Sequence, residues 1–264
     1  VDIDFNYNII VNHVTSNRVF TPGKPATVML PFHYTCDGNE GGTFYRFVGV
    51  KKEENQQWVA TMQETGDDSN MKGALEANTP YLFMPVATTM TFPNINGSVR
   101  LFTRGGSGGN CETAESGSHW KFKGTYEYKE WQSGGANAEE IDRAYSFAGV
   151  ATSGLEVGMF VKIASGAKIR PMCCYLLWND MPNAANARAL TRGAAVTEEE
   201  LPQSITVRLV GSNGEVTGIG EIDTKTGEMT FDSEAWYTLD GVRLSGKPSK
   251  KGLYINNGKK VVIK

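Results

Sequence analysis

Short segments in which apolar and polar residues alternate recur along most of the chain, as is typical of half-buried β-strands. The clearest is Trp120–Tyr128, where four aromatic residues share one parity and mainly lysine, threonine and glutamate take the other. A single aromatic face on a strand is usually an inner face, so we expect it to lie in a core. We expect further strands at Phe5–Asn12, Ala26–Phe32, Thr43–Val50, Gln57–Met62, Tyr81–Pro85, Thr88–Pro93, Ser98–Phe102, Tyr145–Val150, Met159–Ile163 and Ile169–Trp178.

Two segments differ from this alternating pattern. Ile169–Trp178 is apolar on both parities from Met172 onward, which predicts a central strand or one covered on both faces. Asn137–Ala144 is the only segment that predicts a helix, because Asn137 can cap it and Glu140 stands three residues later, as in a capping box. The sequence therefore predicts an all-β protein with one short helix.

A change in composition divides the chain. Residues 179–202 are rich in alanine, asparagine and then glutamate, without any β pattern, and such a segment is typical of a linker. A chain of 264 residues suits one large and one small domain. We expect a β-sandwich display or spacer domain at 1–180, a linker at 181–203, and a small immunoglobulin-like antiparallel β end domain at 204–264.

The end domain contains two strong hairpin signals. Asp240-Gly241 and Asn257-Gly258 each stand between short apolar segments, and both pairs tolerate the positive φ angles of a type I′ turn. Ser204–Val210, Glu215–Ile222 and Glu228–Phe231 supply further expected strands. Together these segments predict a compact antiparallel β structure at the end of the chain.

Two short sequence echoes indicate an internal repeat. Tyr45–Val50 (YRFVGV) resembles Tyr145–Val150 (YSFAGV), and Leu75-Glu76-Ala77 before one strand resembles Leu155-Glu156-Val157 before another. Such self-similarity predicts two similar halves, arranged as two sheets or as two lobes of one sandwich.

Composition and motifs exclude several classes of function. The net charge of −3, with scattered basic residues, gives no electrostatic basis for binding nucleic acid. No apolar run is long enough to span a membrane, and Val1–Asp4 is not a signal peptide. Because the chain lacks an initiator Met, it fits a mature form or an excised fragment. The four cysteines form no CxxC motif, and the glycine-rich segment 105–109 lacks the Gly-Lys-Ser/Thr ending of a phosphate-binding loop. We expect buried thiols, no metal and no cofactor.

The end domain resembles the C-terminal sorting domains of secreted and surface proteins of Bacteroidetes, the type IX secretion class. The resemblance lies in Leu239-Asp240-Gly241, in Gly252-Leu253-Tyr254 and in the closing basic-aliphatic segment 259–264. Upstream, Phe20–Lys24, Leu30-Pro31-Phe32, Leu75–Tyr81 and Ala164–Tyr175 resemble a β module found at the C-terminal end of large leucine-rich-repeat or adhesin-like surface proteins of that phylum. The chain itself has no leucine-rich repeats.

The resemblance implies an extracellular or outer-cell-surface location and outer-membrane export machinery as a partner. It also implies that the export machinery recognises a folded β surface, for which the candidate residues are Gly252, Tyr254, Lys259, Lys260 and Lys264. The same residues also fit plain hairpin chemistry, because Asn257-Gly258 alone accounts for much of the pattern. A surface glycan or a host protein is a further partner that this class of protein suggests.

Candidate catalytic residues are not evident in the sequence. His13, His33 and His119 are far apart, and the densest carboxylates of the first domain, Glu139, Glu140 and Asp142, are typical of a helix N-terminus. Asp67-Asp68 fits a solvated turn. We therefore expect a non-catalytic adhesion or display protein and predict no catalytic residue.

Two other functions remain open. A carbohydrate-binding module needs exposed rings, and Trp131, which breaks the parity of its strand before a glycine-containing loop, is the first candidate. Trp58 is the second candidate for contact with a glycan. A hydrolase is the other alternative, because acid pairs need only meet in space.

Overall fold

The computed structural model of the chain confirms the all-β prediction. It describes residues 7–54, 56–66, 73–95, 97–103, 110–115, 118–148, 158–179 and 201–212, with the short stretches 221–222, 229–230, 236–238, 243–244, 247–256 and 259–263. The helical structure in these residues is one short 3-10 turn, η1 (Ala138–Glu140).

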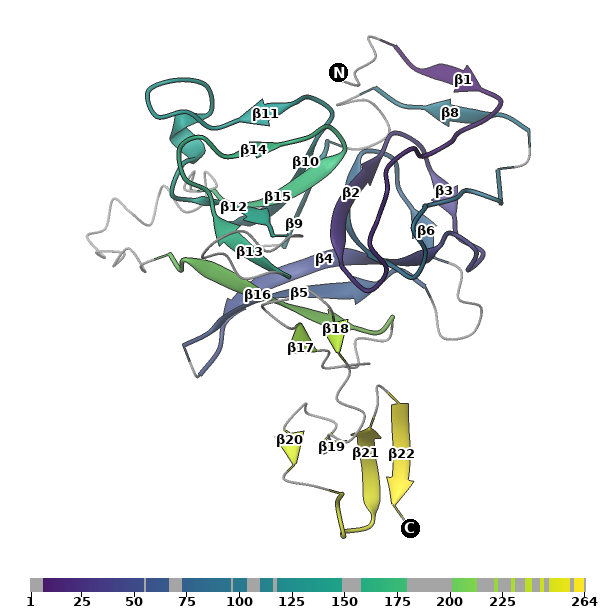
Figure 1. Cartoon of the computed structure of the whole chain (residues 1–264), viewed down its shortest axis with the longest axis vertical. Helices are drawn as coiled ribbons and strands as arrows, with labels where there is room; N and C mark the ends of the chain where they lie inside the picture. Colours follow the sequence, from purple (N-terminus) through teal and green to yellow (C-terminus); the bar gives the residue numbers. More distant parts are fainter. Residues whose placement is uncertain are drawn as a thin grey trace.

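One ten-stranded sheet forms the body of the protein (Figure 1). Its strands, in spatial order, are β2 (Ala26–Leu30), β7 (Thr79–Pro85), β4 (Gly42–Lys52), β5 (Trp58–Glu64), β16 (Ser204–Val210), β13 (Met159–Lys162), β12 (Ala144–Phe147), β15 (Cys173–Trp178), β10 (Trp120–Thr125) and β9 (Glu112–Ala114). All neighbours run antiparallel except β5 and β16, which are parallel.

The sheet contains two copies of the same arrangement. In the first repeat (26–85) the order is β2-β7-β4-β5, and in the second repeat (120–178) it is β10-β15-β12-β13. Each repeat also carries a two-stranded satellite sheet. This sheet pairs β3 (Tyr34–Thr35) with β6 (Ala74–Leu75) in the first repeat and β11 (Lys129–Glu130) with β14 (Lys168–Ile169) in the second. The strands follow one another along the chain in the same order in both repeats.

The registers of the two repeats agree residue by residue. Tyr45 lies opposite Leu82 and Glu64, and Tyr145 lies opposite Leu176 and Lys162 in the equivalent strands. The echo between Tyr45–Val50 and Tyr145–Val150 therefore marks a structural repeat over its described part, in which Tyr45 and Phe47 are equivalent to Tyr145 and Phe147.

The second sequence echo was wrong. It matched the segment before β7 with the segment before β13, whereas the structure makes β7 equivalent to β15. Leu75 lies opposite Tyr34 in the first satellite sheet, and Ile169 lies opposite Lys129 in the second, so Ile169 is the counterpart of Leu75. Residues 155–157 lie outside the described part of the chain.

Strand β16 joins the two repeats. It lies between β5 of the first repeat and β13 of the second, and pairs with both. The assignment of Ser204–Val210 to the end domain is thereby corrected, because this strand belongs to the large sheet. The physical reason is its alternating pattern, which places Ile205, Val207 and Leu209 in the core that both repeats share.

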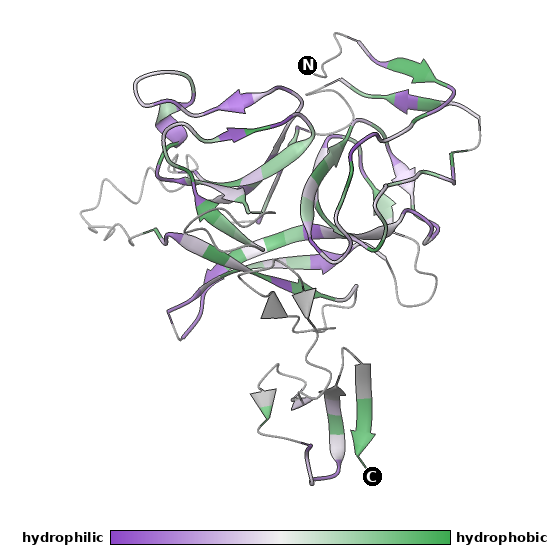
Figure 2. Ribbon diagram, viewed as in Figure 1, coloured by the Kyte–Doolittle hydropathy of each residue, from purple (hydrophilic) through white to green (hydrophobic). Residues whose placement is uncertain are grey.

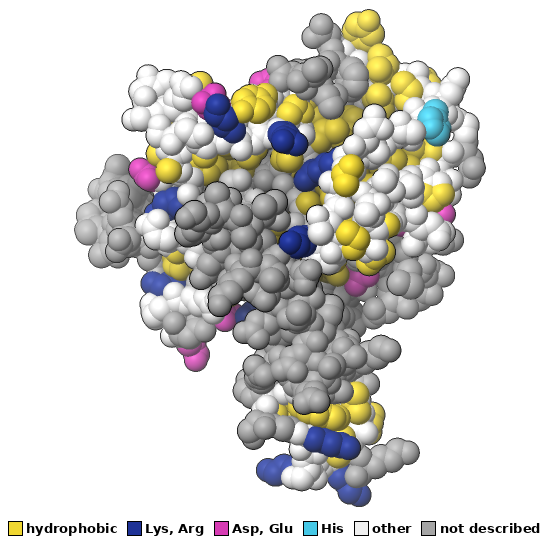
Figure 3. Space-filling model, viewed as in Figure 1, with side chains coloured by type: hydrophobic (Ala, Val, Ile, Leu, Met, Phe, Trp, Pro, Cys, Tyr) yellow, Lys and Arg dark blue, Asp and Glu magenta, His cyan; other side chains and the backbone are white. Residues whose placement is uncertain are grey.

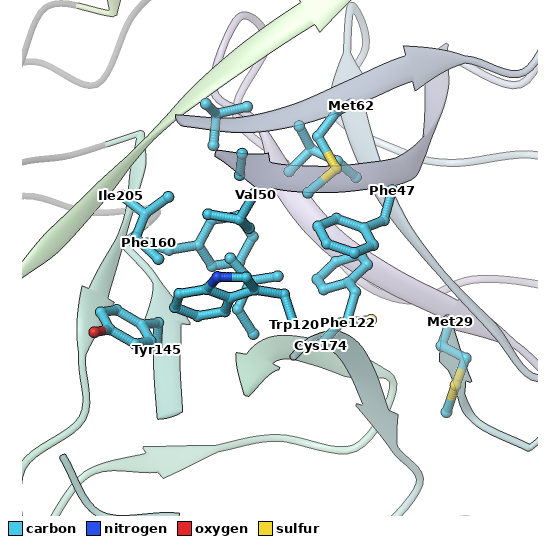
Figure 4. Packing of buried hydrophobic residues seen from close by; sticks show 14 of the residues in the cluster. Met29, Phe47, Val50, Met62, Trp120, Phe122, Tyr145, Phe160, Cys174 and Ile205 are labelled. Carbon is cyan, nitrogen blue, oxygen red and sulfur yellow. The ribbon is translucent and has the colours of Figure 1, made fainter. Parts of the chain in front are cut away.

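The sheet curls around that shared core. Apolar side chains from the strands of both repeats and from β16 point toward one another (Figure 4), and Trp120 and Phe122 lie among them, as the aromatic parity predicted. Tyr126 is also buried there, but Tyr128 is 49% exposed because β10 ends at Thr125. Figure 2 shows apolar residues along β13 and β16, which contribute to this core.

The outer face of each repeat has a core of its own beneath the satellite sheet. In the first repeat Phe44, Tyr81 and Phe83 pack under β3 and β6 together with Tyr34 and Leu75. In the second repeat Trp131, Ile163, Ile169, Tyr175 and Leu177 pack in the equivalent place. Each repeat is thus buried on both faces, in agreement with the apolar pattern predicted for the end of Ile169–Trp178.

A hydroxyl group connects the two repeats across the curl. Thr27 Oγ1 of β2 donates a hydrogen bond to the carbonyl oxygen of Cys174 at 3.1 Å and accepts one from the Cys174 backbone N–H at 2.9 Å. Met29 donates its N–H to the Met172 carbonyl oxygen at 3.2 Å. These bonds bring the edge strand β2 against β15.

The expected helix Asn137–Ala144 is reduced to η1. Asn137 has a left-handed φ of 56° and makes no side-chain cap, and Glu140 turns inward, where it is buried. The expected strand Ile169–Trp178 is divided into β14 and β15 at Met172, whose φ is 62°. Both departures arise where a backbone with positive φ interrupts regular structure.

The end of the chain forms a separate four-stranded sheet, here called the end sheet. Its order is β20 (Arg243–Leu244), β19 (Trp236–Tyr237), β21 (Gly252–Asn256) and β22 (Lys259–Ile263), and Figure 1 shows it beyond the large sheet. Asn256 lies opposite Lys259, so the predicted Asn257-Gly258 hairpin is confirmed. At Asp240-Gly241 the pairing is antiparallel but places Tyr237 opposite Arg243, one residue away from the register of a two-residue turn.

Two further pairs of strands complete the described structure. β1 (Ile9–Val11) pairs with β8 (Val99–Leu101), and β17 (Glu221–Ile222) pairs with β18 (Met229–Thr230). The expected strand at Thr88–Pro93 is limited to one bridge between Val19 and Thr89.

Candidate functional site

The end sheet contains most of the candidate recognition residues. Gly252 and Tyr254 lie two positions apart on β21 and therefore share a face. A Cβ atom on Gly252 would lie 3.2 Å from the Tyr254 ring, so the glycine leaves the space that this ring occupies. Gly252 and Tyr254 thus pack against each other on one face of the sheet.

This face of the end sheet is apolar and half-buried. Trp236, Leu244, Val261 and Ile263 share it with Tyr254, as their cross-strand registers require. The ammonium group of Lys247 lies 5.9 Å from the centre of the Trp236 ring, a cation–π arrangement. The opposite face carries Leu253 and Val262, which are paired and are 38% and 63% exposed.

The candidate lysines occupy the last strand of this sheet. Lys259 and Lys260 belong to β22, which pairs with β21 on one side and is the edge strand in the described order. Lys264 lies outside the described residues. The structure therefore brings Gly252, Tyr254, Lys259 and Lys260 together on one hairpin.

The candidate glycan contacts are not surface residues. Trp131 is 0% exposed and packs in the outer core of the second repeat, where its ring lies 5.2 Å from that of Tyr175. The expectation of an exposed Trp131 was wrong because the satellite strand β11 and turn η1 fold over it. Trp58 is 8% exposed and packs against Trp120 in the shared core. Neither ring presents a free face to a sugar.

A buried carboxylate explains the orientation of Trp131. Glu140 Oε2 accepts a hydrogen bond from Trp131 Nε1 at 3.0 Å, and Oε1 accepts one from the Tyr175 hydroxyl at 3.1 Å. Lys129 Nζ lies 3.0 Å from Oε2 and Lys123 Nζ lies 3.7 Å from Oε1. These contacts form one network that fixes turn η1 on the outer face of β10 and β15.

Two opposing effects act on the charge of Glu140. Burial raises the pKa of this carboxyl group, but the hydrogen bonds of Lys129 and Trp131 and the positive charges of Lys129 and Lys123 together lower it by more, so that the pKa lies below its ordinary value. Lys129 is itself held by Asn137 Oδ1 at 2.8 Å and lies over the rings of Trp131 and Tyr175. The carboxylate is therefore charged at neutral pH and fully engaged in structural contacts.

The first repeat contains the equivalent carboxylate. Glu40 precedes β4 as Glu140 precedes β12, and it is 2% exposed. Its oxygens accept hydrogen bonds from the Tyr34 hydroxyl and from the backbone N–H groups of Asp37 and Gly38 at 2.7–3.1 Å. In both repeats a buried glutamate holds the loop between the satellite strand and the next strand of the large sheet. The sequence did not predict this equivalence, because Glu40 binds a tyrosine and backbone N–H groups whereas Glu140 binds a tryptophan, a tyrosine and lysines.

The structure also shows aromatic residues nearer the surface. The rings of His119 and Trp178 are stacked at 4.7 Å and an angle of 26°, and both residues are partly exposed. Figure 3 shows hydrophobic side chains gathered on the upper part of the face in view, with Lys and Arg side chains among them. Trp178 was missed as a surface residue because it ends a strand that is otherwise buried.

The remaining titratable candidates stand apart from one another. His33 pairs with Glu76 at 2.7 Å, and His119 lies next to Asn179 in the other repeat. Glu139 is exposed on η1, and Asp67-Asp68 lie outside the described residues. All four cysteines are free thiols. Within the described ranges, no cluster of three or more His, Cys, Asp or Glu residues could hold a metal ion.

Two final observations concern the chain as a whole. No helix in the part of the chain that the structure describes is long and apolar enough to cross a membrane. Comparisons of the chain with protein-family models, with curated proteins and with solved structures found no match.

Proposed function

We propose that the chain is a non-catalytic secreted or cell-surface protein, in which a β-sandwich-like body is displayed and an immunoglobulin-like end domain directs export or attachment. The observation that supports this most is the end sheet, in which Gly252, Tyr254, Lys259 and Lys260 lie on one hairpin that ends in an edge strand. An edge strand offers unpaired backbone groups to a partner, and its lysines add charge. The partner in this proposal is outer-membrane export machinery of the type IX class.

The test is export of the full chain behind a signal peptide in a host with that export route. External protease should reach the body when the chain is intact, and removal of residues 259–264 should retain it in the periplasm. Lys259→Ala with Lys260→Ala should reduce surface exposure, and Tyr254→Ala should do the same by removing the ring that packs over Gly252.

The matched control changes the exposed residues Lys250 and Lys251 to Ala, which removes the same charge from the loop before β21. These variants should be exported like the unchanged chain. If the intact chain stays in the periplasm, or if both lysine pairs act alike, the end sheet is a structural domain and the export proposal fails.

Carbohydrate binding is the second candidate function, and the partly exposed His119–Trp178 stack supports it. Sugar rings bind on aromatic faces, and this stack and Tyr128, which is 49% exposed, both reach the surface. Trp178→Ala should abolish binding to a surface-glycan array, and Tyr128→Ala should weaken it. An unchanged binding profile in both variants would remove this candidate.

A further inference from the structure

Strand β16 lies between the two repeats and belongs to neither of them. Its seven residues follow both repeats in the chain, and its backbone pairs with β5 on one side and β13 on the other. In the described sheet order no strand of one repeat pairs directly with a strand of the other. The inter-repeat slot, defined here as the space between β5 and β13, is therefore closed by this one strand.

The slot has approximate twofold symmetry, and β16 matches it. Met62 of β5 and Phe160 of β13 are equivalent residues of the two repeats, because Phe47 and Phe147 lie opposite them in the same register. Met62 lies beside Leu209, and Phe160 lies beside Ile205. Val207, midway between Ile205 and Leu209, therefore lies at the centre of the slot.

The side chains of the repeats clamp both ends of the strand. The second repeat holds the beginning, where Tyr145 donates its hydroxyl to the Pro202 carbonyl oxygen and Lys162 donates to that of Leu201, both at 2.8 Å. The first repeat holds the other end, where Gln63 donates to the Ser212 carbonyl oxygen at 2.7 Å. In each of these bonds a side chain of a repeat is the donor, and a backbone carbonyl oxygen just outside β16 is the acceptor.

From this arrangement we propose that the slot accepts β16 from a second copy of the chain, so that the protein assembles by exchanging this strand. An identical strand from another copy makes the same hydrogen bonds and buries the same Ile205, Val207 and Leu209. The contacts within the slot therefore contribute the same free energy whichever copy supplies the strand. Residues 180–200 separate β16 from the second repeat, and a chain of that length spans at most roughly 70 Å. The fraction of chains that exchange β16 then depends on the protein concentration.

The β16 strand of the same chain competes with that of a second copy for the slot. Because it is tethered, its effective concentration is in the millimolar range. The chain should therefore be monomeric when dilute and exchanged when it refolds at comparable concentration or is displayed densely. Strands that have been exchanged remain trapped after dilution, because release requires opening of the slot on both sides.

The test uses full-length chains that each carry one new cysteine. Ser204 of β16 and Val161 of β13 lie opposite each other and are partly exposed, so the strand of one chain beside β13 of another brings Ser204→Cys of the first within reach of Val161→Cys of the second. Peptide mapping identifies the disulfide between these two positions apart from any that the four native cysteines form. The two variants are mixed, unfolded under reducing conditions, refolded together and oxidised. The control replaces Val161→Cys by Arg46→Cys, at an exposed position of β4 away from β16.

A chain with both cysteines, refolded when dilute, should form the bond within one molecule, which shows that the pair is in reach and that the variants fold. The mixed pair refolded near millimolar concentration should give a mixed disulfide at least several-fold above the Arg46→Cys control. A yield equal to the control overturns the proposal. An excess of the peptide 201–212 should lower the yield, whereas the same peptide with Val207→Asp should not; equal effects of both peptides also overturn it.

Discussion

The indole Nε1 of Trp131 donates a hydrogen bond to the buried carboxylate of Glu140 at 3.0 Å. This bond joins the residue that the sequence marked as an exposed ring to one that it marked as a helix-terminal charge. Both are structural, because turn η1 and strand β11 close over the outer core of the second repeat. Substitutions that remove this bond therefore test the packing of the outer core of the second repeat.

Loss of the Glu140 carboxylate should destabilise the protein strongly. Glu140→Ala leaves Lys129, whose side chain is 16% exposed, without its ion pair and leaves Trp131 and Tyr175 without an acceptor. Breaking a buried pair on one side costs about 3–5 kcal/mol of the free energy of unfolding. Urea denaturation measures this loss, with Glu139→Ala as the control, because Glu139 is exposed on the same turn and should change stability by less than about 0.5 kcal/mol.

The same carboxylate should make stability depend on acidic pH. Burial raises the pKa of this carboxyl group, but Lys129, Trp131 and Lys123 together lower it below the ordinary value of 4.5 in the folded protein. A lowered folded pKa contributes stability that is complete above 4.5 and is lost as the pH falls through the folded pKa. Denaturation midpoints measured between neutral pH and acid should therefore decline below 4.5 less steeply in Glu140→Gln than in the unchanged chain. Parallel profiles would show that Glu140 is not the group responsible.

Trp131→Ala should act on folding and not selectively on ligand binding. The ring is 0% exposed, and truncation of a buried tryptophan costs about 3–5 kcal/mol. Tyr128→Ala, three residues earlier and 49% exposed, should change the free energy of unfolding by less than about 1 kcal/mol. Chemical denaturation measures the free energy of unfolding of both variants. A Trp131→Ala chain as stable as the unchanged chain would contradict the burial of this residue.

The hydroxyl group of Thr27 should contribute to the contact between the two repeats. Thr27→Val keeps the shape but leaves the buried Cys174 N–H without its acceptor, which costs about 1–3 kcal/mol. Thr27→Ser keeps the hydroxyl and should cost less than Thr27→Val. Thermal unfolding compares the two; if the valine variant is as stable as the serine variant, the hydroxyl bridge does not hold β2 against β15.

Local sequence patterns predicted those features that depend on neighbouring residues. The alternation of Trp120 and Phe122 with lysines set which face of β10 lies in the core, because side chains of a strand alternate between its faces. Asn257-Gly258 set the pairing of β21 with β22, since a two-residue turn fixes the register of its hairpin. The YRFVGV and YSFAGV segments marked the repeat because they occupy equivalent strands.

Contacts between distant segments were beyond these patterns. Ser204–Val210 shows the alternation of a half-buried strand whichever sheet it joins, and only the empty edges of β5 and β13 decide its place. Glu40 and Glu140 look like ordinary surface carboxylates in sequence, and their burial follows from tyrosine, lysine or tryptophan partners supplied by other segments.

The sequence by itself determined the β class, the inner face of its clearest strand and the closing hairpin, because these follow from backbone geometry over a few residues. Only the tertiary structure decided that two repeats share one sheet, that β16 joins them, and that Trp131 is buried. Each of these depends on pairing across many residues, where the free energy comes from apolar burial and hydrogen bonds that no single segment contains.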